Sequence, residues 1–493
     1  MKRLLAALAL SASLTSLAAP QRAVVVRLAD TAGVVSAVSK VGEFIGNPML
    51  VMSLTAGLAA HPAAQFFGPA REGETLELAA YLDPDKEAKD LDALAEGMRY
   101  SVLYPVAKGK ADFLKAHPDA REQDGVIAVK EPKGAFVGFS RDDTWAVLSD
   151  DAGCVREALA GRANRQKPLQ GDVLRASVRP VALKALARLA EPFVNEMSGK
   201  AEQDQMKMAL DLMRQITGAR LALRIDEAGI TVRSTMEVTP ESLFAKIGAK
   251  TLTGGENLAF AGKDAVYAAA YAADCGQADV GALLDKATAL AAKYGFDLGW
   301  AALTKQGAAR TLTFDFDGCV KYLTALDASK FEKIDVKALE ADLSALSGDM
   351  SGPKVENPEG AIALALKGLD AQTTPAARFA RMAPEAAAKK PYMVCAASLY
   401  SAVRALAPKA VALLPEEDRQ AIQPLLQTLP PEGLGGMAAY NWRDGAALKG
   451  VLRVSPDEIK GLSSCATIGL GYMLQQQMKA MQTEMIDDDD DED

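Results

Sequence analysis

The sequence predicts an α+β protein made of two tandem, diverged repeat modules, each a mixed or antiparallel sheet with helices packed on it. The prediction rests on two blocks of residues that each occur twice. Residues 173–186 (VLRASVRPVALKAL) and 393–406 (MVCAASLYSAVRAL) align without a gap. Further along each copy, residues 221–241 and 437–457 align as well, and a loop absorbs the small difference in spacing between the blocks. We interpret this pattern as a duplication.

Each copy has the pattern of a strand, two helices and a hairpin. The first strand (173–178 or 393–398) leads into a helix with Leu or Val at helical spacing, and a second helix follows. Two alternating strands then flank a glycine, Gly229 in one copy and Gly445 in the other. Because glycine adopts positive φ without a Cβ clash, it suits the tight turn of a hairpin.

A helix start follows the hairpin in each copy. Thr239 and Ser455 are each followed by a proline and an acidic residue. The hydroxyl group accepts a hydrogen bond from a free N–H, proline supplies the first helical φ, and the acid faces the positive end of the helix dipole. The same arrangement twice predicts helices that begin at Pro240 and Pro456.

Hydrophobic periodicity predicts the other elements, with a period of 2 for strands and 3.6 for helices. In the first module we expect strands at 23–28, 74–82, 99–106, 125–129, 135–139 and 145–148, and helices at 31–45, 110–117 and 150–159. In the second we expect strands at 265–271, 310–316 and 361–366, and helices at 278–294 and from Thr374 onward.

Strands joined by hairpins, with helices between groups of strands, predict antiparallel or mixed sheets covered by helices on one face. We expect two such layers side by side. A groove between the modules is a common place for a ligand, by analogy of architecture.

The first 18 residues have the features of a signal peptide. Lys2 and Arg3 precede an apolar run that is too short to span a bilayer, which takes about 20 residues, and Ser16-Leu17-Ala18 offers a cleavage site. We therefore expect an exported protein, periplasmic or secreted, with no membrane span after cleavage. The predicted organisation is 1–18 signal peptide, 19–250 first module, 264–469 second module, and 470–493 terminal helix and acidic tail.

The formal net charge of −9 is concentrated at one end, where residues 487–493 are seven consecutive acids. Without these acids and the leader the body is near −4, and no segment of it accumulates basic residues. This distribution argues against nucleic acid as a partner.

No motif identifies a catalytic, cofactor or metal site. The two histidines, His61 and His117, each precede proline, which favours loop or helix-end positions and a structural role. The sequence has no Gly-x-Ser-x-Gly, His-Glu-x-x-His or Walker loop, and no complete calcium loop. We therefore predict no catalytic residue, no metal and no cofactor. A catalytic pair of carboxylates that come together only in the folded protein, as in glycosidases, is the alternative that we retain.

Five cysteines are present without a Cys-x-x-Cys motif, which excludes the usual redox and zinc spacings. An exported protein allows disulfides. The candidate pairs are Cys275 with Cys319 and Cys395 with Cys465, and buried free thiols are the equal alternative.

The helix that begins at Pro456 is predicted to continue to Ile486. One of its faces carries an apolar stripe formed by Leu470, Leu474, Met478, Met481 and Met485. The stripe either packs on the second module or docks a partner protein, for which adaptable methionines are suited.

These observations favour an exported, non-enzymatic binding or envelope-associated protein whose partner is a protein or a small ligand. The alternative is an exported hydrolase that uses a carboxylate pair.

Overall fold

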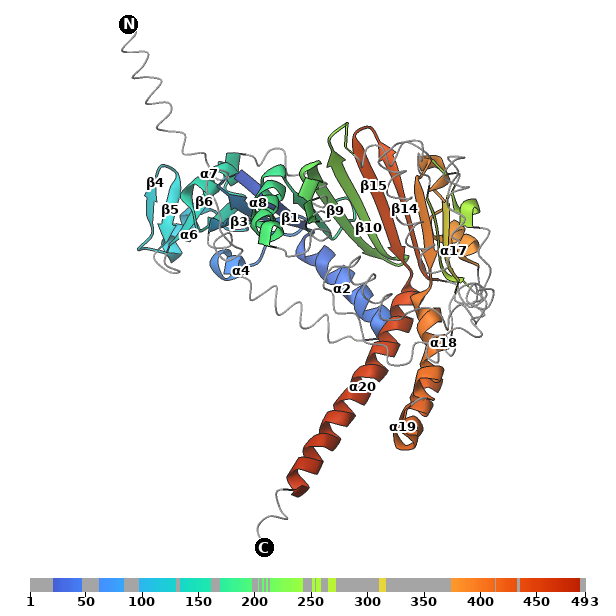
Figure 1. Ribbon diagram of the computed structural model, residues 1–493. Coiled ribbons are helices and arrows are strands. Elements are labelled where there is room, and N and C mark those ends of the chain that lie inside the picture. Colours follow the sequence, from blue (N-terminus) through green and yellow to red (C-terminus); the bar gives the residue numbers. More distant parts are fainter. Residues whose placement is uncertain are drawn as a thin grey trace.

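The computed structural model describes residues 21–46, 62–83, 97–129, 134–160, 169–196, 203–242, 251–258, 265–271, 310–315, 374–412, 414–431 and 435–487, apart from short gaps at 204–205, 208–209, 212 and 253. The described strands form one 15-stranded sheet in which all the neighbouring strands are antiparallel. Figure 1 shows this sheet with helices packed against it and a long helix leaving it. The α+β class and the antiparallel sheet are thereby confirmed.

The first half of the chain contributes ten strands, which run from one end of the sheet to its middle. Its elements are β1 (Gln21–Leu28), α2 (Thr31–Ile45), α4 (Pro62–Phe67), β2 (Leu76–Leu82), β3 (Arg99–Pro105), α6 (Lys110–Ala116), β4 (Arg121–Gln123), β5 (Val126–Val129), β6 (Ala135–Phe139), β7 (Trp145–Ser149), α7 (Ala152–Ala160), β8 (Leu174–Val178), α8 (Pro180–Glu196), β9 (Ile216–Asp226) and β10 (Gly229–Val238).

The second half contributes the other five strands and the helices of the projecting part. Its described elements are η2 (Gly255–Leu258), β11 (Ala265–Tyr271), β12 (Arg310–Asp315), α17 (Pro375–Met382), η3 (Ala387–Lys389), β13 (Met393–Ala397), α18 (Leu399–Val411), α19 (Glu416–Gln427), β14 (Met437–Asp444), β15 (Ala447–Val454) and α20 (Pro456–Asp487). The predicted helix at 278–294, strand at 361–366 and leader at 1–18 lie outside the described residues.

The two halves meet at the β10–β15 pair, where eight residue pairs are in register from Ile230–Val454 to Glu237–Ala447. Outward from this pair, the order β10-β9-β8-β1-β2 on one side corresponds to β15-β14-β13-β11-β12 on the other. The two layers that we expected side by side are therefore a single layer, because each half satisfies the backbone groups of the other's edge strand.

Helices cover both faces of the sheet, so the expectation of one covered face is wrong. Val24 packs with Ala182 of α8, whereas the next residue, Val25, packs in a cluster with Cys154 of α7. Because successive side chains of a strand point to opposite faces, α7 and α8 lie on opposite sides. The helix α17 covers the far end of the sheet through Phe379, which packs in the core formed with strands β11, β13, β14 and β15.

Both hairpin glycines have positive φ, but for different reasons. Gly445 lies inside the turn between β14 and β15, with φ of 62°, and a Cβ there would meet no atom within 4 Å. Gly229 is the first residue of β10, with φ of 110°, and a Cβ there would lie 2.1 Å from the carbonyl oxygen of Val454. The first glycine accommodates a turn and the second the approach of β15.

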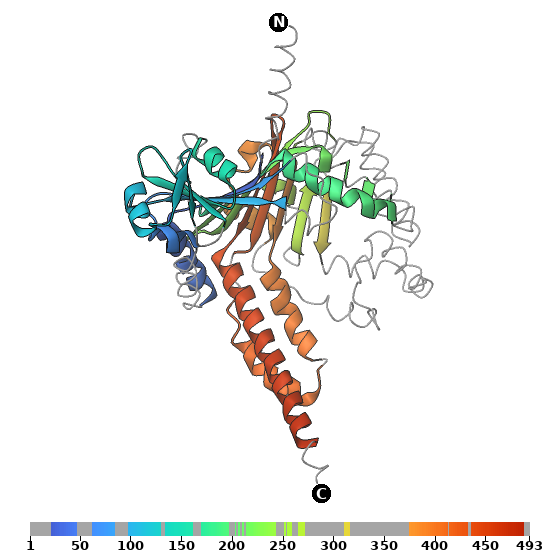
Figure 2. The same cartoon turned by 90° about the vertical axis from the view of Figure 1, so that its left-hand side faces the viewer.

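The helix α20 begins at Pro456, as predicted, and runs without interruption across the predicted domain boundary at residue 470. The Ser455 hydroxyl accepts a hydrogen bond from the Glu458 N–H, at 3.2 Å, which is the expected cap. Near its start α20 packs on α18, where Gly461 lies against the ring of Tyr400. Figures 1 and 2 both show the rest of α20 pointing away from the sheet beside α18 and α19.

Among the helices that the structure describes, none combines the length and the apolar character that crossing a membrane requires.

Candidate functional site

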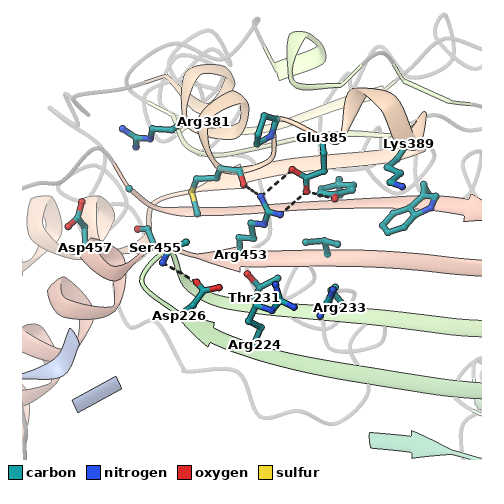
Figure 3. Close-up of a pocket in the computed structure, with 17 residues that line it drawn as sticks. Arg224, Asp226, Thr231, Arg233, Arg381, Glu385, Lys389, Arg453, Ser455 and Asp457 are labelled. Atoms are coloured by element: carbon teal, nitrogen blue, oxygen red, sulfur yellow. Dashed lines mark hydrogen bonds and ion pairs between the residues drawn. The ribbon is translucent and has the colours of Figure 1, made fainter. Parts of the chain in front are cut away.

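The candidate site is a trough on the sheet face that α7 and α17 share, in the space between these two helices. Two cavities, of about 840 Å³ and about 420 Å³, adjoin there at Arg233, which lines both. Strands β14, β15, β10, β9, β8 and β1 form the floor, and the segment from Arg381 to Lys389 forms a wall of the larger cavity. Figure 3 shows this larger cavity, with the strand residues on one side and Arg381, Glu385 and Lys389 on the other.

Strand register places basic residues on the trough side of the sheet. Residues that pair across an antiparallel ladder point to the same face. Thr231 of β10 pairs with both Arg224 and Arg453, and Arg233 pairs with Ala222, which in turn pairs with Arg175. The basic residues that line the two cavities are Arg27, Arg175, Arg220, Arg224, Arg233, Arg381, Lys389 and Arg453. We call this surface the cationic trough.

One buried carboxylate, that of Asp172, organises the centre of the trough. Its side chain is 1% exposed and forms ion pairs with three arginines: with Arg175 at 2.7 Å, with Arg224 at 3.7 Å, and with Arg233. Arg175 and Arg224 also donate hydrogen bonds to the backbone carbonyls of Leu169 and Gln170. These contacts fix the guanidinium groups in place and leave three positive charges around one negative charge.

A second ion pair anchors the other end of the trough. Arg453 contacts both carboxylate oxygens of Glu385, at 2.9 and 3.2 Å, and Tyr440 donates a hydrogen bond to the same carboxylate at 2.5 Å. Burial, together with the neighbouring Glu385 carboxylate, raises the pKa of Tyr440, so the phenol keeps its proton. The Lys389 ammonium lies 5.9 Å from the centre of the Trp442 ring, a cation–π contact.

The trough carries an excess of positive charge. Of the residues that the structure describes, eight basic and four acidic ones line its two cavities, in a chain whose formal net charge is −9. Burial lowers the pKa of Arg27. The nearby positive charge of Arg175 also lowers it, and the negative charge of Glu77 opposes both effects. The side chains of Arg175, Arg224, Arg233 and Arg453 are 34–42% exposed, so each is partly open to solvent although its guanidinium group contacts a carboxylate.

Our sequence analysis missed these residues because it looked for basic residues that cluster along the chain. In the fold they come from separate strands, and Arg233 and Arg453 meet only through the β10–β15 pairing. The available signal was weak: most of these strands carry an arginine at an alternating position, as in AVVVRL, LALRID, ITVRST and GVLRV. Alternation shows that such arginines share a face within one strand, but not which strands lie together.

Cys395 and Cys465 are free thiols in the structure, so the candidate disulfide between them is not formed. Cys395 lies within β13, whereas Cys465 lies nine residues into α20, about 14 Å along its axis. Cys154 is also a free thiol, and burial raises its pKa to about 12. Cys275 and Cys319 lie outside the described residues.

The apolar stripe of the terminal helix is exposed where its side chains are described. Leu470 and Leu474 are 56% and 59% exposed, and the neighbouring Met473 is 54% exposed. The side chains of Met478, Met481 and Met485 lie outside the described part. These two leucines therefore do not pack on the second module, and docking of a partner protein stays a prediction.

His117 occupies a helix end, as the His–Pro pattern predicts. It is the C-terminal cap of α6, and its ring stacks on Phe66 and lies 4.4 Å, centre to centre, from Phe113. His61 lies outside the described residues. In the part of the chain that the structure describes, no group of three or more His, Cys, Asp or Glu side chains is arranged to hold a metal ion.

The larger cavity contains three carboxylates, those of Asp226, Glu385 and Asp457. Glu385 is held by Arg453 and Tyr440, and Asp226 accepts a hydrogen bond at 3.0 Å from the Ala228 N–H in the hairpin turn. Two of the three carboxylates therefore have structural partners.

No protein-family model matches the chain, and comparisons with curated proteins and with solved structures find no significant match.

Proposed function

We propose that the protein binds an elongated anionic ligand in the cationic trough and does so without catalysing a reaction on it. The ligand carries carboxylate, phosphate or sulfate groups. In this proposal the protein is exported, as its first 18 residues predict, and meets the ligand in the periplasm or outside the cell.

The observation that carries the proposal is the group of three arginines around Asp172. A structural ion pair needs one arginine for one carboxylate, and two further guanidinium groups on the same carboxylate repel each other. Partly exposed, oriented guanidinium groups with incomplete neutralisation are well suited to anions, because each presents a planar fork of N–H donors. An anion above Arg175, Arg224 and Arg233 would relieve this repulsion.

The dimensions of the trough favour an extended ligand over a single small ion. The floor crosses six strands from β14 to β1, which is roughly 24 Å at the usual strand spacing. The partly buried Trp442 lies at one end of this floor and offers apolar ring surface next to charged groups. A chain molecule with repeated negative charges fits both features.

We also propose that the chain contains two copies of one module and that the trough arose at their junction. The matched sequence blocks and the corresponding order of strands on either side of the β10–β15 pair support this duplication. Residues of both halves line the larger cavity, with Arg224 and Arg233 from the first half and Arg381 and Arg453 from the second. The predicted position of a ligand groove, between the modules, agrees with this location.

Isothermal titration calorimetry with defined anions tests the proposed function. Inorganic tripolyphosphate and oligogalacturonate are the probes. We expect Arg233→Gln to weaken binding by roughly ten- to a hundredfold, since one charged hydrogen-bonding group contributes about 1.5–3 kcal/mol. The matched control is Arg443→Gln, which lies on the opposite face of the same sheet and should leave binding unchanged.

The proposal would be contradicted if the protein bound neither anion at low ionic strength. It would also be contradicted if Arg233→Gln and Arg443→Gln bound the anions equally well. The alternative function, a hydrolase with a carboxylate pair, places Asp226 and Asp457 at the reaction. It predicts turnover of glycoside or peptide substrates that is lost in Asp226→Asn and Asp457→Asn.

A further inference from the structure

We propose that the acidic tail of a second copy of this chain is a ligand of the cationic trough, so that the protein associates with itself through tail and trough. This inference rests on the proposed function, because it names a partner for the same site. Three observations support it: charge, length, and the direction in which α20 leaves the sheet.

The charges of the two surfaces are complementary. Residues 487–493 (DDDDDED) are seven consecutive acids. Among the described residues, eight basic and four acidic ones line the trough, and the side chain of Arg220 is 66% exposed although it pairs with Glu237. A run of carboxylates meeting a row of fixed guanidinium groups forms charge-assisted hydrogen bonds.

The lengths also agree. Asp487 ends α20, and the six acids that follow it span about 20 Å in an extended conformation. The strands that carry the outermost arginines of the trough floor, β15 and β1, lie four strand spacings apart, roughly 19 Å. One tail therefore suffices to contact the arginines at both ends, from Arg27 on β1 to Arg453 on β15.

The tail cannot reach the trough of its own chain. Asp457, the second residue of α20, lines the larger cavity, and from there the helix runs 32 residues, about 48 Å, away from the sheet. The six residues that follow Asp487 span at most about 21 Å when fully extended. Occupation of the trough by a tail therefore requires a second copy. Because tail and trough are different surfaces, the contact is heterologous: it closes when two copies exchange tails or when more copies form a ring, and otherwise it continues as an open chain of copies.

Two variants of the full-length mature protein test this by complementation. The tail variant lacks residues 487–493 and keeps its trough. The trough variant carries Arg220→Gln and Arg233→Gln and keeps its tail, while Asp172 keeps its contacts with Arg175 and Arg224. Circular dichroism and thermal melting first establish that both variants are folded, and Arg443→Gln is the matched charge control on the other face.

Analytical ultracentrifugation at low ionic strength is the measurement. We expect the unaltered protein and the Arg443→Gln control to associate, and each test variant alone to be monomeric. An equimolar mixture of the two variants should form a 1:1 complex, because the tail of one fits the trough of the other. The complex should dissociate in about 0.5 M NaCl, where charge interactions are screened within a few ångströms. The synthetic peptide DDDDDED should bind the tail variant, and NNNNNQN should not.

The outcomes separate the two proposals. If tripolyphosphate or oligogalacturonate binds but the unaltered protein stays monomeric and the acidic peptide does not bind, the self-association is refuted and the proposed function stands. If neither the anions nor the peptide bind, both are refuted. Association that persists in the tail variant alone would place the interface elsewhere and overturn the inference.

Discussion

At the scale of single residues, a few side chains and glycines carry much of the architecture. Asp172 gathers three arginines, and Glu458 joins two helices by accepting hydrogen bonds from the Tyr400 N–H at 2.9 Å and the Ser398 hydroxyl at 3.3 Å. Gly229 permits β15 to approach β10. The sequence suggested the two hairpin glycines but did not distinguish their roles, because the role depends on what lies opposite each one.

The two hairpin glycines should respond differently to the same substitution. Gly445→Ala places a side chain in open space and costs about 1–2 kcal/mol, from the positive φ alone. Gly229→Ala also drives a Cβ into the Val454 carbonyl, where backbone would have to move, and should cost about 3 kcal/mol or more. Urea denaturation of the two variants measures the difference. Equal losses of stability would show that β15 does not pack against Gly229 as described.

The Glu458 carboxyl should make stability depend on pH. Burial raises its pKa above the ordinary 4.5, and this effect exceeds the opposing effect of the backbone and Ser398 hydrogen bonds. The folded protein therefore binds the proton more tightly than the unfolded chain, and the associated stability is present below pH 4.5 and lost as the pH rises through the raised pKa.

Replacing Glu458 by Gln removes this titration and keeps an acceptor for the backbone N–H groups. We expect the stability of Glu458→Gln relative to the unaltered protein to increase as the pH rises above about 4.5. Chemical denaturation at a series of pH values measures it. A constant difference between the two proteins at all pH values would contradict the prediction.

At the scale of elements, the sequence predicted most of the described helices and strands to within a few residues. Amphipathic periodicity and caps are local signals, and α2, α6 and α20 follow them closely. The burial of an element is not local. The stripe on α20 was compatible with a buried or an exposed face, and the structure leaves Leu470 and Leu474 exposed.

Because these leucines are exposed, polar replacements should leave the fold intact. We expect Leu470→Ser with Leu474→Ser to change the free energy of unfolding by no more than about 0.5 kcal/mol. The matched control is Ile422→Ala on α19, whose side chain is 6% exposed and whose truncation should cost about 2–4 kcal/mol. A large loss in the leucine variant would show that the stripe packs inside the protein.

At the scale of the whole molecule, the β10–β15 pair decides both the shape and the site. It joins the two halves into one sheet and brings Arg233 and Arg453 to one face. Eight residue pairs across this junction couple the halves energetically.

The coupling predicts that the described strands of both halves open together. Hydrogen exchange should report one common free energy of opening for the core strands β9, β10, β14 and β15. Ser234→Pro, at the centre of β10 opposite Gly450, removes a strand N–H and should split the transition in two. Separate transitions in the unaltered protein would instead show two independent domains.

Much of the secondary structure of this protein could be predicted from local features of its sequence. Periodicity, caps and glycines specified the elements, and the repeated blocks predicted a duplication. These features depend on neighbours a few residues apart. The single continuous sheet was decided by strand pairing between residues more than 200 positions apart, such as Thr231 and Arg453. The covering of both of its faces and the gathering of arginines depend on pairing between strands that are also distant in the sequence, such as β1 with β8. The register of the β10–β15 pair depends on how the edge strands of the two folded halves fit together, and no local sequence pattern encodes that register.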